Sequence, residues 1–409
     1  MRKCFKDGNT SMEIETDFDS SSNSKNEINI DQEIYDGFMP FKSFSLYSLN
    51  HFRSWCNLSK MSSLKKEDKE VGSPIRFDNL PDVILFKIFS YLYIGDLCRA
   101  GRVCLRWYHL TRCHVLWKHV DAHDMQLTSY QIQKLVPILP SCVMYLRICS
   151  LSTQQRIPFL TPHTAIEIRE RCPQLRTLII ESAFIAKHIN FTDITVEDLP
   201  QKLSVLSLRK SFFHTDQFFC SVSHPTVPKI KVLDCSSCWC VCDNDIPFFS
   251  RLSDLQEIYL ANCPISDAGV VTLLKGVENL KVLDLENTEI GAQTISTLSQ
   301  NCSLLEKLYL GNTPITDEHL LCIQNSSLPM LQIICLRKTH ISCVGLRYLI
   351  SCLNTLKYMN VSTCNISSEC ALELNLHVSL KKRLQFDVNE DGGQEYCDHF
   401  LLRSSQFEN

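Results

Sequence analysis

The sequence predicts an α/β protein in which a small helical unit precedes a solenoid of strand-and-helix repeats, with a parallel sheet on the concave side of a horseshoe. Three observations predict this architecture. A six-residue apolar motif recurs from residue 143 to residue 361, helix-like segments follow its copies, and a block with helical apolar spacing begins at Leu80.

The composition is that of a folded protein with a real core. The chain has 409 residues, of which 44% are hydrophobic and 21% charged, and its formal net charge is −4. This charge gives no broad electrostatic reason to expect a nucleic acid or an anionic membrane as the main partner. No apolar run approaches the roughly 18 residues that a membrane-spanning helix needs, so we expect no contact with a bilayer.

The 22 cysteines are best explained as reduced thiols in an intracellular protein. The chain begins MRKCFKDGNTSMEIETDFDSSSNSK, which lacks the apolar core of a secretory signal. Cysteine without a secretory route favours small buried apolar groups over disulfides. We therefore expect a cytoplasmic or nuclear protein, and the sequence leaves the choice between the two open.

The first 75 residues are predicted to be a disordered extension and linker. Residues 1–35 are rich in Ser, Asn, Asp and Glu and cannot bury enough apolar surface to offset the entropy of ordering. Residues 38–59 carry Phe38, Phe41, Phe44, Phe52 and Trp55, either as a partner-binding segment or as a patch over the folded part. A loosely packed extension is the favoured interpretation. The polar stretch 62–73 is predicted to be a linker.

Two apolar stripes predict short helices after Leu80. Pro81 suits a first helical turn, and Gly95 and Asp96 are expected to end one helix and to cap the next. The first stripe comprises Leu85, Ile88, Phe89 and Leu92, and the second comprises Leu97, Ala100, Cys104 and Trp107, with a break near Gly101. Such a small core needs a neighbour or a bound partner to hold it.

Clear copies of the repeat motif start at residue 175, and the repeat region continues to about residue 380. The copies are LRTLII, LSVLSL, IKVLDC, LQEIYL, LKVLDL, LEKLYL, LQIICL and LKYMNV, which start at residues 175, 203, 230, 255, 280, 305, 331 and 356. VMYLRI at residue 143 is a plausible first member, which gives about nine units over 123–380 and a cap or tail over 381–409. Helix-like segments follow at 267–277, 292–302 and 317–325. This is the pattern of a leucine-rich repeat.

Residues 80–117, LPDVILFKIFSYLYIGDLCRAGRVCLRWYHLTRCHVLW, resemble an F-box, here bounded as 76–122. The family pattern is matched at Leu80-Pro81, Ile88-Phe89-Ser90-Tyr91-Leu92, Asp96-Leu97, Val103-Cys104, Trp107 and Leu116-Trp117. Tyr93-Ile94-Gly95 departs from it, where a short turn that often contains Pro is common. An F-box followed by leucine-rich repeats is the arrangement of the F-box and leucine-rich-repeat protein family. The stretches RVCLRWYHLTRCHVLWKHVD and ERCPQLRTL resemble one member in particular.

The resemblance implies that the F-box docks on a Skp1-like adaptor, which hangs from a cullin scaffold with a RING subunit. The docking set that it implies is Leu80, Pro81, Ile84, Leu85, Ile88, Phe89, Leu92, Leu97, Val103, Cys104 and Trp107. Many of these side chains could instead fill the small helical core. For Leu85, Phe89 and Trp107 the two roles are evenly balanced.

No constellation in the sequence predicts catalysis, a metal or a cofactor. Cys235, Cys238, Cys240 and Cys242 lack the paired C-x2-C spacing of common zinc sites. The first three occupy the sixth, ninth and eleventh places of a repeat, which point into the core. Cys172, Cys302 and Cys352 are expected to pack at the ends of helices. His119 and His123 could share a helix face, but no third ligand lies nearby.

The third, fifth and seventh residues of each repeat should face the concave side, because side chains alternate along a strand. The predicted recognition patch for a protein substrate is Tyr259, Asp284, Glu286, Lys307, Tyr309, Arg337 and Tyr358. The alternative is that these are solvated strand positions. The longer early repeats, 143–230, could also carry the specificity.

The function that these observations favour is that of a non-catalytic substrate-recognition adaptor in a ubiquitin ligase of the Skp1–cullin–F-box type. The repeats would hold an unknown protein beside a charged E2, which raises its effective concentration there. The alternative is a Skp1-bound scaffold that takes no part in ubiquitin transfer.

Overall fold

The computed structural model describes residues 79–151, 158–185, 194–220, 227–323, 327–367 and 369–370, together with the backbone of 385–387. All of them belong to one of the chain's two units, Lys65–Asn409. The predicted extension and linker over 1–75, with its aromatic segment 38–59, lies outside the described residues. So does most of the predicted cap or tail over 381–409.

The helical unit consists of α3 (Asp82–Phe89), α4 (Ile94–Ala100), α5 (Leu105–Thr111) and the 3-10 turn His114–Trp117. Pro81 is the N-cap residue of α3, one position before the first turn in which it was expected, and Gly101 follows the last residue of α4. The expected cap at Asp96 is wrong, because α4 begins at Ile94 with Tyr93 as its N-cap residue. Asp96 instead lies in the first turn and accepts a hydrogen bond from Arg99 at 2.6 Å.

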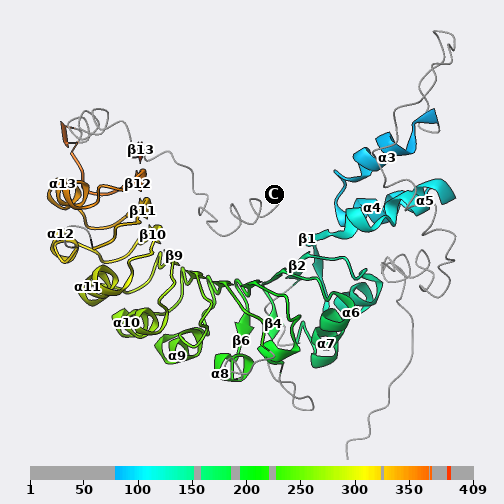
Figure 1. Ribbon diagram of the computed structural model, residues 1–409, viewed down its shortest axis with the longest axis horizontal. Helices are drawn as coiled ribbons and strands as arrows, with labels where there is room; N and C mark the ends of the chain where they lie inside the picture. The colour runs from blue at the N-terminus through cyan, green and yellow to red at the C-terminus, as the bar shows by residue number, and fades with distance from the viewer. Residues whose placement is uncertain are drawn as a thin grey trace, which may run out of the picture. The chain divides into compact units, whose positions relative to one another are not determined.

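Eleven parallel strands form one sheet in the order β1-β2-β3-β5-β7-β8-β9-β10-β11-β12-β13. Their bounds are β1 His119–Leu127, β2 Tyr145–Ser150, β3 Thr177–Glu181, β5 Val205–Ser207, β7 Val232–Asp234, β8 Glu257–Tyr259, β9 Val282–Asp284, β10 Lys307–Tyr309, β11 Ile333–Cys335, β12 Tyr358–Asn360 and β13 Gln385–Asp387. Figure 1 shows them side by side along the inner curve of the repeat region. The α/β class and the concave parallel sheet are therefore confirmed.

Helices follow most of the strands and lie on the outer curve (Figure 1). They are α6 (Ser129–Leu135), α7 (Pro162–Arg171), α8 (Thr215–Phe218), α9 (Ile246–Phe249), α10 (Asp267–Gly276), α11 (Ala292–Asn301), α12 (Asp317–Leu320) and α13 (Cys343–Cys352). Three 3-10 turns, Val136–Ile138, Val196–Asp198 and Asp243–Asp245, and the short strands β4 (Phe184–Ile185) and β6 (Phe212–Phe213) complete the described elements.

Sequence periodicity predicted the positions of the strands accurately, but it missed the first and last strands of the sheet and the end of α12. Each of the nine expected copies from residue 143 to residue 356 contains a strand that begins at its third residue. The sheet also has a strand before the first copy, β1, and one after the last, β13, and neither was expected. Helices α10 and α11 match their expected segments closely, whereas α12 ends at Leu320, short of the expected residue 325.

Acidic residues link α10 to α11 and α12 to α13. Oδ1 of Asp267, at the start of α10, accepts hydrogen bonds from N–H of Gly291 at 2.8 Å and from N–H of Thr294 at 3.0 Å. Asp317, at the start of α12, accepts one from N–H of Ser342 at 2.9 Å. The first N–H groups of a helix have no partner within the helix, so a carboxylate from the preceding repeat satisfies them.

Alternating side chains divide the sheet into two apolar layers. The fourth and sixth residues of the repeats pack toward the helices, in one cluster that also contains Leu85, Phe89 and Leu97 of the helical unit. A second cluster, on the other face, comprises Ile179, Val205, Val232, Tyr259, Val282, Tyr309 and Cys335.

Among the described residues, no helix is long and apolar enough to cross a membrane.

Candidate protein-binding surfaces

The expected docking set of the helical unit divides into exposed and buried side chains. Ile84, Ile88 and Val103 are 46%, 38% and 64% exposed, and Pro81 and Cys104 are also exposed. Tyr91 and Leu105, which were not in the expected set, add large exposed side chains to the same unit. Apolar groups in water favour association with another surface, so these seven residues form the exposed part of the candidate F-box surface.

The other members of the set hold the helical unit together. Leu85, Phe89 and Leu97 are buried in the core cluster, while Leu80, Leu92 and Trp107 are partly buried against it. The rings of Phe89 and Trp107 meet edge to face with centroids 5.1 Å apart, a favourable arrangement for aromatic pairs. For Leu85 and Phe89 the structure therefore shows a core position.

Arg106 fixes the beginning of α3, and sequence reasoning missed it. Its Nε donates to Oδ1 of Asp82 at 2.7 Å and its Nη2 donates to the carbonyl of Leu80 at 2.5 Å. The guanidinium thus ties α5 to the Leu80-Pro81 segment, 26 residues earlier in the chain. The sequence gives no periodic signal for such a contact, because it depends on how α3 and α5 cross.

On the sheet, Tyr259, Asp284 and Tyr309 are direct neighbours in register across three strands, as expected. All three are buried, as is Glu286, whereas Lys307, Arg337 and Tyr358 are half-buried. Tyr259 donates a hydrogen bond to Glu257 at 2.9 Å. The interpretation of the whole column as solvated strand positions is therefore too simple.

Glu286 is the hub of a polar cluster on this face. Its carboxylate accepts hydrogen bonds from Nε and Nη2 of Arg337 at 3.2 and 2.8 Å, and from the thiol of Cys335 at 3.1 Å. Burial raises the pKa of the Cys335 thiol well above its usual value, and the negative charge of Glu286 raises it further. The Glu286–Arg337 pair spans the intervening repeat just beyond the end of β10, and it joins two repeats that are not neighbours.

A second polar cluster lies on the early strands and was not anticipated. Arg147 pairs with Glu181 at 2.7 Å and lies 3.6 Å from Asp121. His123 Nε2 lies 3.5 Å from the same Glu181 carboxylate. The suggestion that His119 and His123 share a helix face is wrong, since both lie in strand β1, where the ring of His119 stacks on Tyr145 at 5.5 Å.

The cysteine-rich turn after β7 is mostly core. Cys235 and Cys238 are fully buried, and burial raises the pKa of the Cys235 thiol well above its usual value. The eleventh place differs from the expectation, because Cys240 is only partly buried and Val241 fills the core instead. Within the described residues no group of three or more His, Cys, Asp or Glu side chains could hold a metal ion.

The helix-end cysteines lie where the repeat pattern placed them. Cys172 and Cys302 directly follow α7 and α11, Cys352 is the last residue of α13, and all three are buried. Burial raises the pKa of both Cys172 and Cys302 to about 12. Thiols with such pKa values are protonated at neutral pH and are poor nucleophiles.

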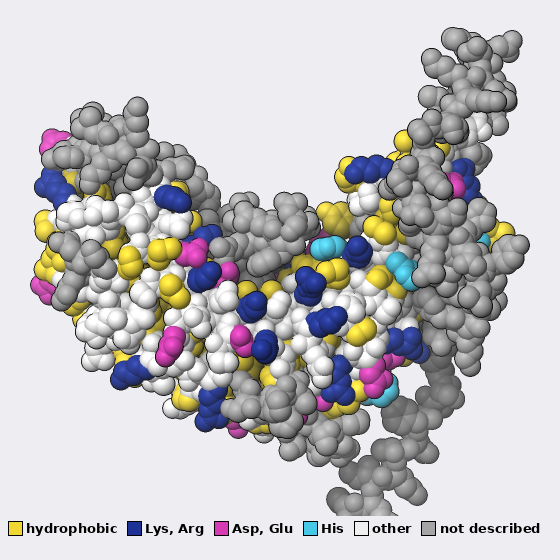
Figure 2. Space-filling model, viewed as in Figure 1, with side chains coloured by type: hydrophobic (Ala, Val, Ile, Leu, Met, Phe, Trp, Pro, Cys, Tyr) yellow, Lys and Arg dark blue, Asp and Glu magenta, His cyan; other side chains and the backbone are white. Residues whose placement is uncertain are grey.

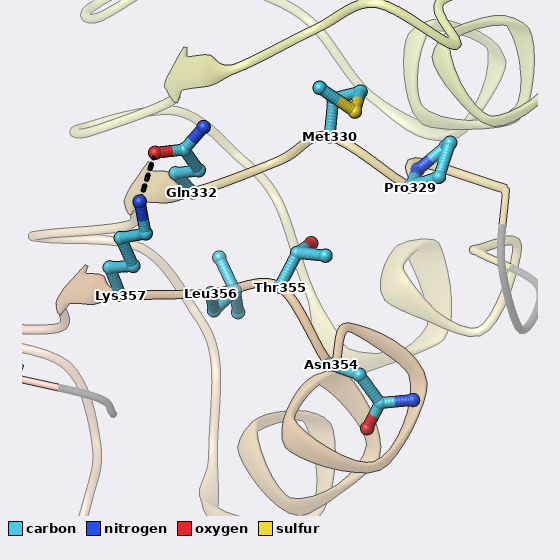
Figure 3. A pocket seen from close by; sticks show the side chains of 7 residues that line it. All are labelled: Pro329, Met330, Gln332, Asn354, Thr355, Leu356 and Lys357. Carbon is cyan, nitrogen blue, oxygen red and sulfur yellow. Dashed lines mark hydrogen bonds between the residues drawn. The ribbon is translucent and has the colours of Figure 1, made fainter. Parts of the chain in front are cut away.

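A pocket of about 530 Å³ lies between two late repeats (Figure 3). Pro329, Met330 and Gln332 line one side, and Asn354, Thr355, Leu356 and Lys357 line the other. Lys357 donates to the side-chain oxygen of Gln332 at 2.7 Å across it. Lys357 is the only ionisable side chain among the seven lining residues. Figure 2 shows Lys and Arg interspersed with Asp and Glu over the visible face of the repeats.

Comparison with known proteins agrees with both parts of the structure. Residues 77–123 match the family model described as F-box-like. F-box/LRR-repeat protein 12 of Mus musculus is 24% identical over 275 residues, which cover 63% of this chain and 78% of that protein. F-box/LRR-repeat protein 5 of Pongo abelii is 35% identical over 74 residues, 17% of this chain and 11% of its own.

The resemblance to F-box and leucine-rich-repeat proteins is confirmed. The family member that the two quoted stretches indicated is F-box/LRR-repeat protein 12, and it is among the proteins matched. Among solved structures, an internalin of Listeria monocytogenes aligns over 62% of this chain and 62% of its own, with 14% identity and a TM-score of 0.39.

Proposed function

We propose that this F-box and leucine-rich-repeat protein is the substrate-recognition subunit of a Skp1–cullin–F-box ubiquitin ligase, acting inside the cell. The observation that carries the proposal is the joint presence of an F-box-like domain with exposed apolar side chains and a curved repeat sheet. The helical unit would dock on Skp1, and the sheet would hold the protein to be ubiquitinated.

In this mechanism the chain makes and breaks no bond. It raises the concentration of a bound protein's lysines beside a charged E2, which is carried by the cullin–RING part of the complex. Burial raises the pKa values of the Cys235 and Cys263 thiols well above the usual range, so neither thiol is suited to carry ubiquitin at neutral pH.

The exposed members of the docking set are proposed to contact Skp1 directly. Ile84 and Ile88 lie on one side of α3, four residues apart, and so share a helix face. Leu85 and Phe89 are proposed to act through the core, by holding α3 and α5 in the arrangement that presents these side chains.

For the substrate, the half-buried side chains of Lys307, Arg337 and Tyr358 are proposed to make first contact. The buried members of the patch, Tyr259, Asp284, Glu286 and Tyr309, are proposed to support them from within the sheet. The longer early repeats, with the Arg147–Glu181 pair, remain an alternative recognition surface.

The decisive experiment is co-purification from cells with the full chain as bait. Replacing Ile84 and Ile88 together by Asp should abolish Skp1 capture, because two charges would be buried in an apolar interface. Leu304→Asp is the matched control, since Leu304 is 42% exposed but lies on the repeats. Skp1 capture that survives the double substitution would contradict the proposed surface.

The same experiment distinguishes the ligase from the scaffold. A cullin recovered with Skp1 supports a ligase subunit, and ubiquitin transfer to a co-purified protein in the reconstituted complex would complete the case. Skp1 recovered without any cullin favours a scaffold with no part in ubiquitin transfer.

A further inference from the structure

The residues directly before successive strands form a row along one edge of the sheet, with a cation at every second place. Within this edge row the backbone N–H of each member donates to the carbonyl of the preceding one, at 2.7 to 2.9 Å. Neighbouring strands lie about 4.8 Å apart, so the cations follow one another at about 10 Å. In chain order the edge row consists of Lys118, Met144, Arg176, Ser204, Lys231, Gln256, Lys281 and Glu306.

The first three cations of the edge row have no acidic partner. Lys118, Arg176 and Lys231 are exposed, and none of them forms an ion pair with a residue that the structure describes. Lys281 differs, because its Nζ lies 3.7 Å from Oε1 of Glu306, the next member of the row. The unbalanced positive charge of the edge row is therefore confined to the strands from β1 to β7.

Two further lysines add to this charge. Lys202 and Lys229 are exposed, and each directly precedes the first apolar residue of its repeat, two positions before a member of the edge row. Nζ of Lys202 donates to the side-chain oxygen of Gln174 at 2.7 Å, and this neutral partner leaves the charge uncompensated. In the next repeat Asp254 takes the place of Lys229, so the positive stretch ends there. Together with the three unpaired cations of the edge row, the two lysines form the basic edge, which comprises Lys118, Arg176, Lys202, Lys229 and Lys231.

The basic edge is suited to a partner of opposite charge, because like charges without counter-charges raise the local potential. We propose that it binds an acidic segment of the protein that this chain recognises, which presupposes the substrate-recognition role proposed above. The segment is extended, lies across the starts of the strands and carries Asp or Glu at about every third residue. An extended chain advances about 3.3 Å per residue, so carboxylates three residues apart match cations about 10 Å apart.

A protein segment fits this charge better than a nucleic acid does. The basic edge ends at Asp254, the edge row is neutralised at Glu306, and the whole chain has a formal net charge of −4. Nucleic-acid-binding domains usually carry a positive net charge and a basic stripe over a whole face. The acidic segment would contact the early repeats, which leaves Lys307, Arg337 and Tyr358 of the concave patch to other parts of the same partner.

The test is fluorescence anisotropy with the purified full chain and a labelled peptide in which every third residue is Glu. The peptide should bind, a Gln counterpart should not, and about 200 mM salt should weaken binding relative to about 50 mM, because salt screens exposed charges. Arg176→Glu combined with Lys231→Glu should weaken binding about tenfold or more. The matched control is Lys210→Glu with Lys338→Glu, which makes the same change of net charge and should leave the affinity nearly unchanged. Lys210 and Lys338 are exposed and lie after the ends of β5 and β11, away from the starts of the strands.

A measurement on the unaltered protein guards against variants that misfold. The Glu peptide should protect Lys118 and Lys231 from acetylation and leave Lys210 unprotected. Equal loss of affinity in the two double variants, or equal protection of all three lysines, would overturn the proposal. So would an oligothymidine of equal charge that binds more tightly than the peptide with the same dependence on Arg176 and Lys231, because that result favours a nucleic acid.

Co-purification from cells separates the basic edge from the proposed ligase function. The chain with Arg176→Glu and Lys231→Glu should still capture Skp1 and a cullin, because its F-box is unchanged. Failure of the unaltered chain to capture a cullin would contradict the ligase function and leave the peptide result standing. Peptide binding that ignores Arg176 and Lys231 would contradict the basic edge alone.

Discussion

Arg337 and Glu286 form a two-bonded ion pair across the repeat that lies between them, with Nη2 of Arg337 at 2.8 Å from Oε2 of Glu286 and Nε at 3.2 Å from Oε1. Gly311 on the intervening repeat leaves the space for it. A Cβ at Gly311 would lie 2.6 Å from Oε1 of Glu286 and 2.7 Å from Cγ of Arg337. The pair therefore depends on the absence of a side chain at position 311, in the turn that follows β10.

Gly311→Ala is expected to destabilise the protein by about 1–3 kcal/mol, because the added methyl overpacks the Glu286–Arg337 pair. Urea unfolding followed by circular dichroism measures the change. Gly95→Ala is the control, since a Cβ there meets nothing within 4 Å and lies in a helix. In an Arg337→Ala background the cost of Gly311→Ala should shrink, and an undiminished cost would mean that the pair is not what the methyl displaces.

Phe89 and Ile88 are adjacent in α3, but their replacement by Ala should affect stability very differently. Phe89→Ala should cost about 3–5 kcal/mol, because it removes a buried ring that packs on Trp107. Ile88→Ala, at an exposed position, should change stability by no more than about 0.5 kcal/mol while weakening Skp1 capture. Thermal unfolding and co-purification of the two variants test this. An equal loss of stability would place Ile88 in the core as well.

Asp267 should make stability depend on pH in the acid range. Burial alone would raise the pKa of Asp267, but hydrogen bonds from Thr294, Gly291 and Gln293 lower it below 3.8. A depressed pKa in the folded state means that the stabilisation is complete above about pH 3.8 and is lost as pH falls through the lower folded value.

Asp267→Asn should therefore cost about 0.5–2 kcal/mol at neutral pH, in the range of other helix-capping losses. Its unfolding free energy should also fall less steeply than that of the wild type between pH 4 and pH 2, a range of about two units around the affected pKa. If the unfolding free energies of the two proteins fell in parallel with pH, the carboxylate charge of Asp267 would contribute nothing to capping the helix.

The cysteines after β7 should behave as packing groups and not as metal ligands. Cys235→Ala removes a fully buried sulfur and should cost about 1 kcal/mol, whereas Cys242→Ala, near the surface, should cost little. Chelation with EDTA should leave the thermal midpoint of the wild type unchanged. Equal losses in the two variants together with a chelator-sensitive midpoint would indicate a zinc site.

The sequence by itself determined the elements whose signal is periodic. Leucines at fixed places specify strands at Val282, Lys307 and their equivalents, because each repeat must bury the same face against its neighbours. The same periodicity placed Cys302 at a helix end and Cys235 in the core. The resemblance to an F-box rests on the dense match of its motif. The sequence of α3 alone could not tell which residues of the docking set are exposed and which are buried.

Only the tertiary structure decided which side chains meet across repeats. Glu286 and Arg337 are 51 residues apart, and Arg106 reaches the carbonyl of Leu80 from 26 residues away. No local pattern encodes these contacts, since they depend on the stagger of neighbouring repeats and on a gap at Gly311. The burial of Tyr259 has the same origin, because the alternation of a strand selects a face but not what packs against it.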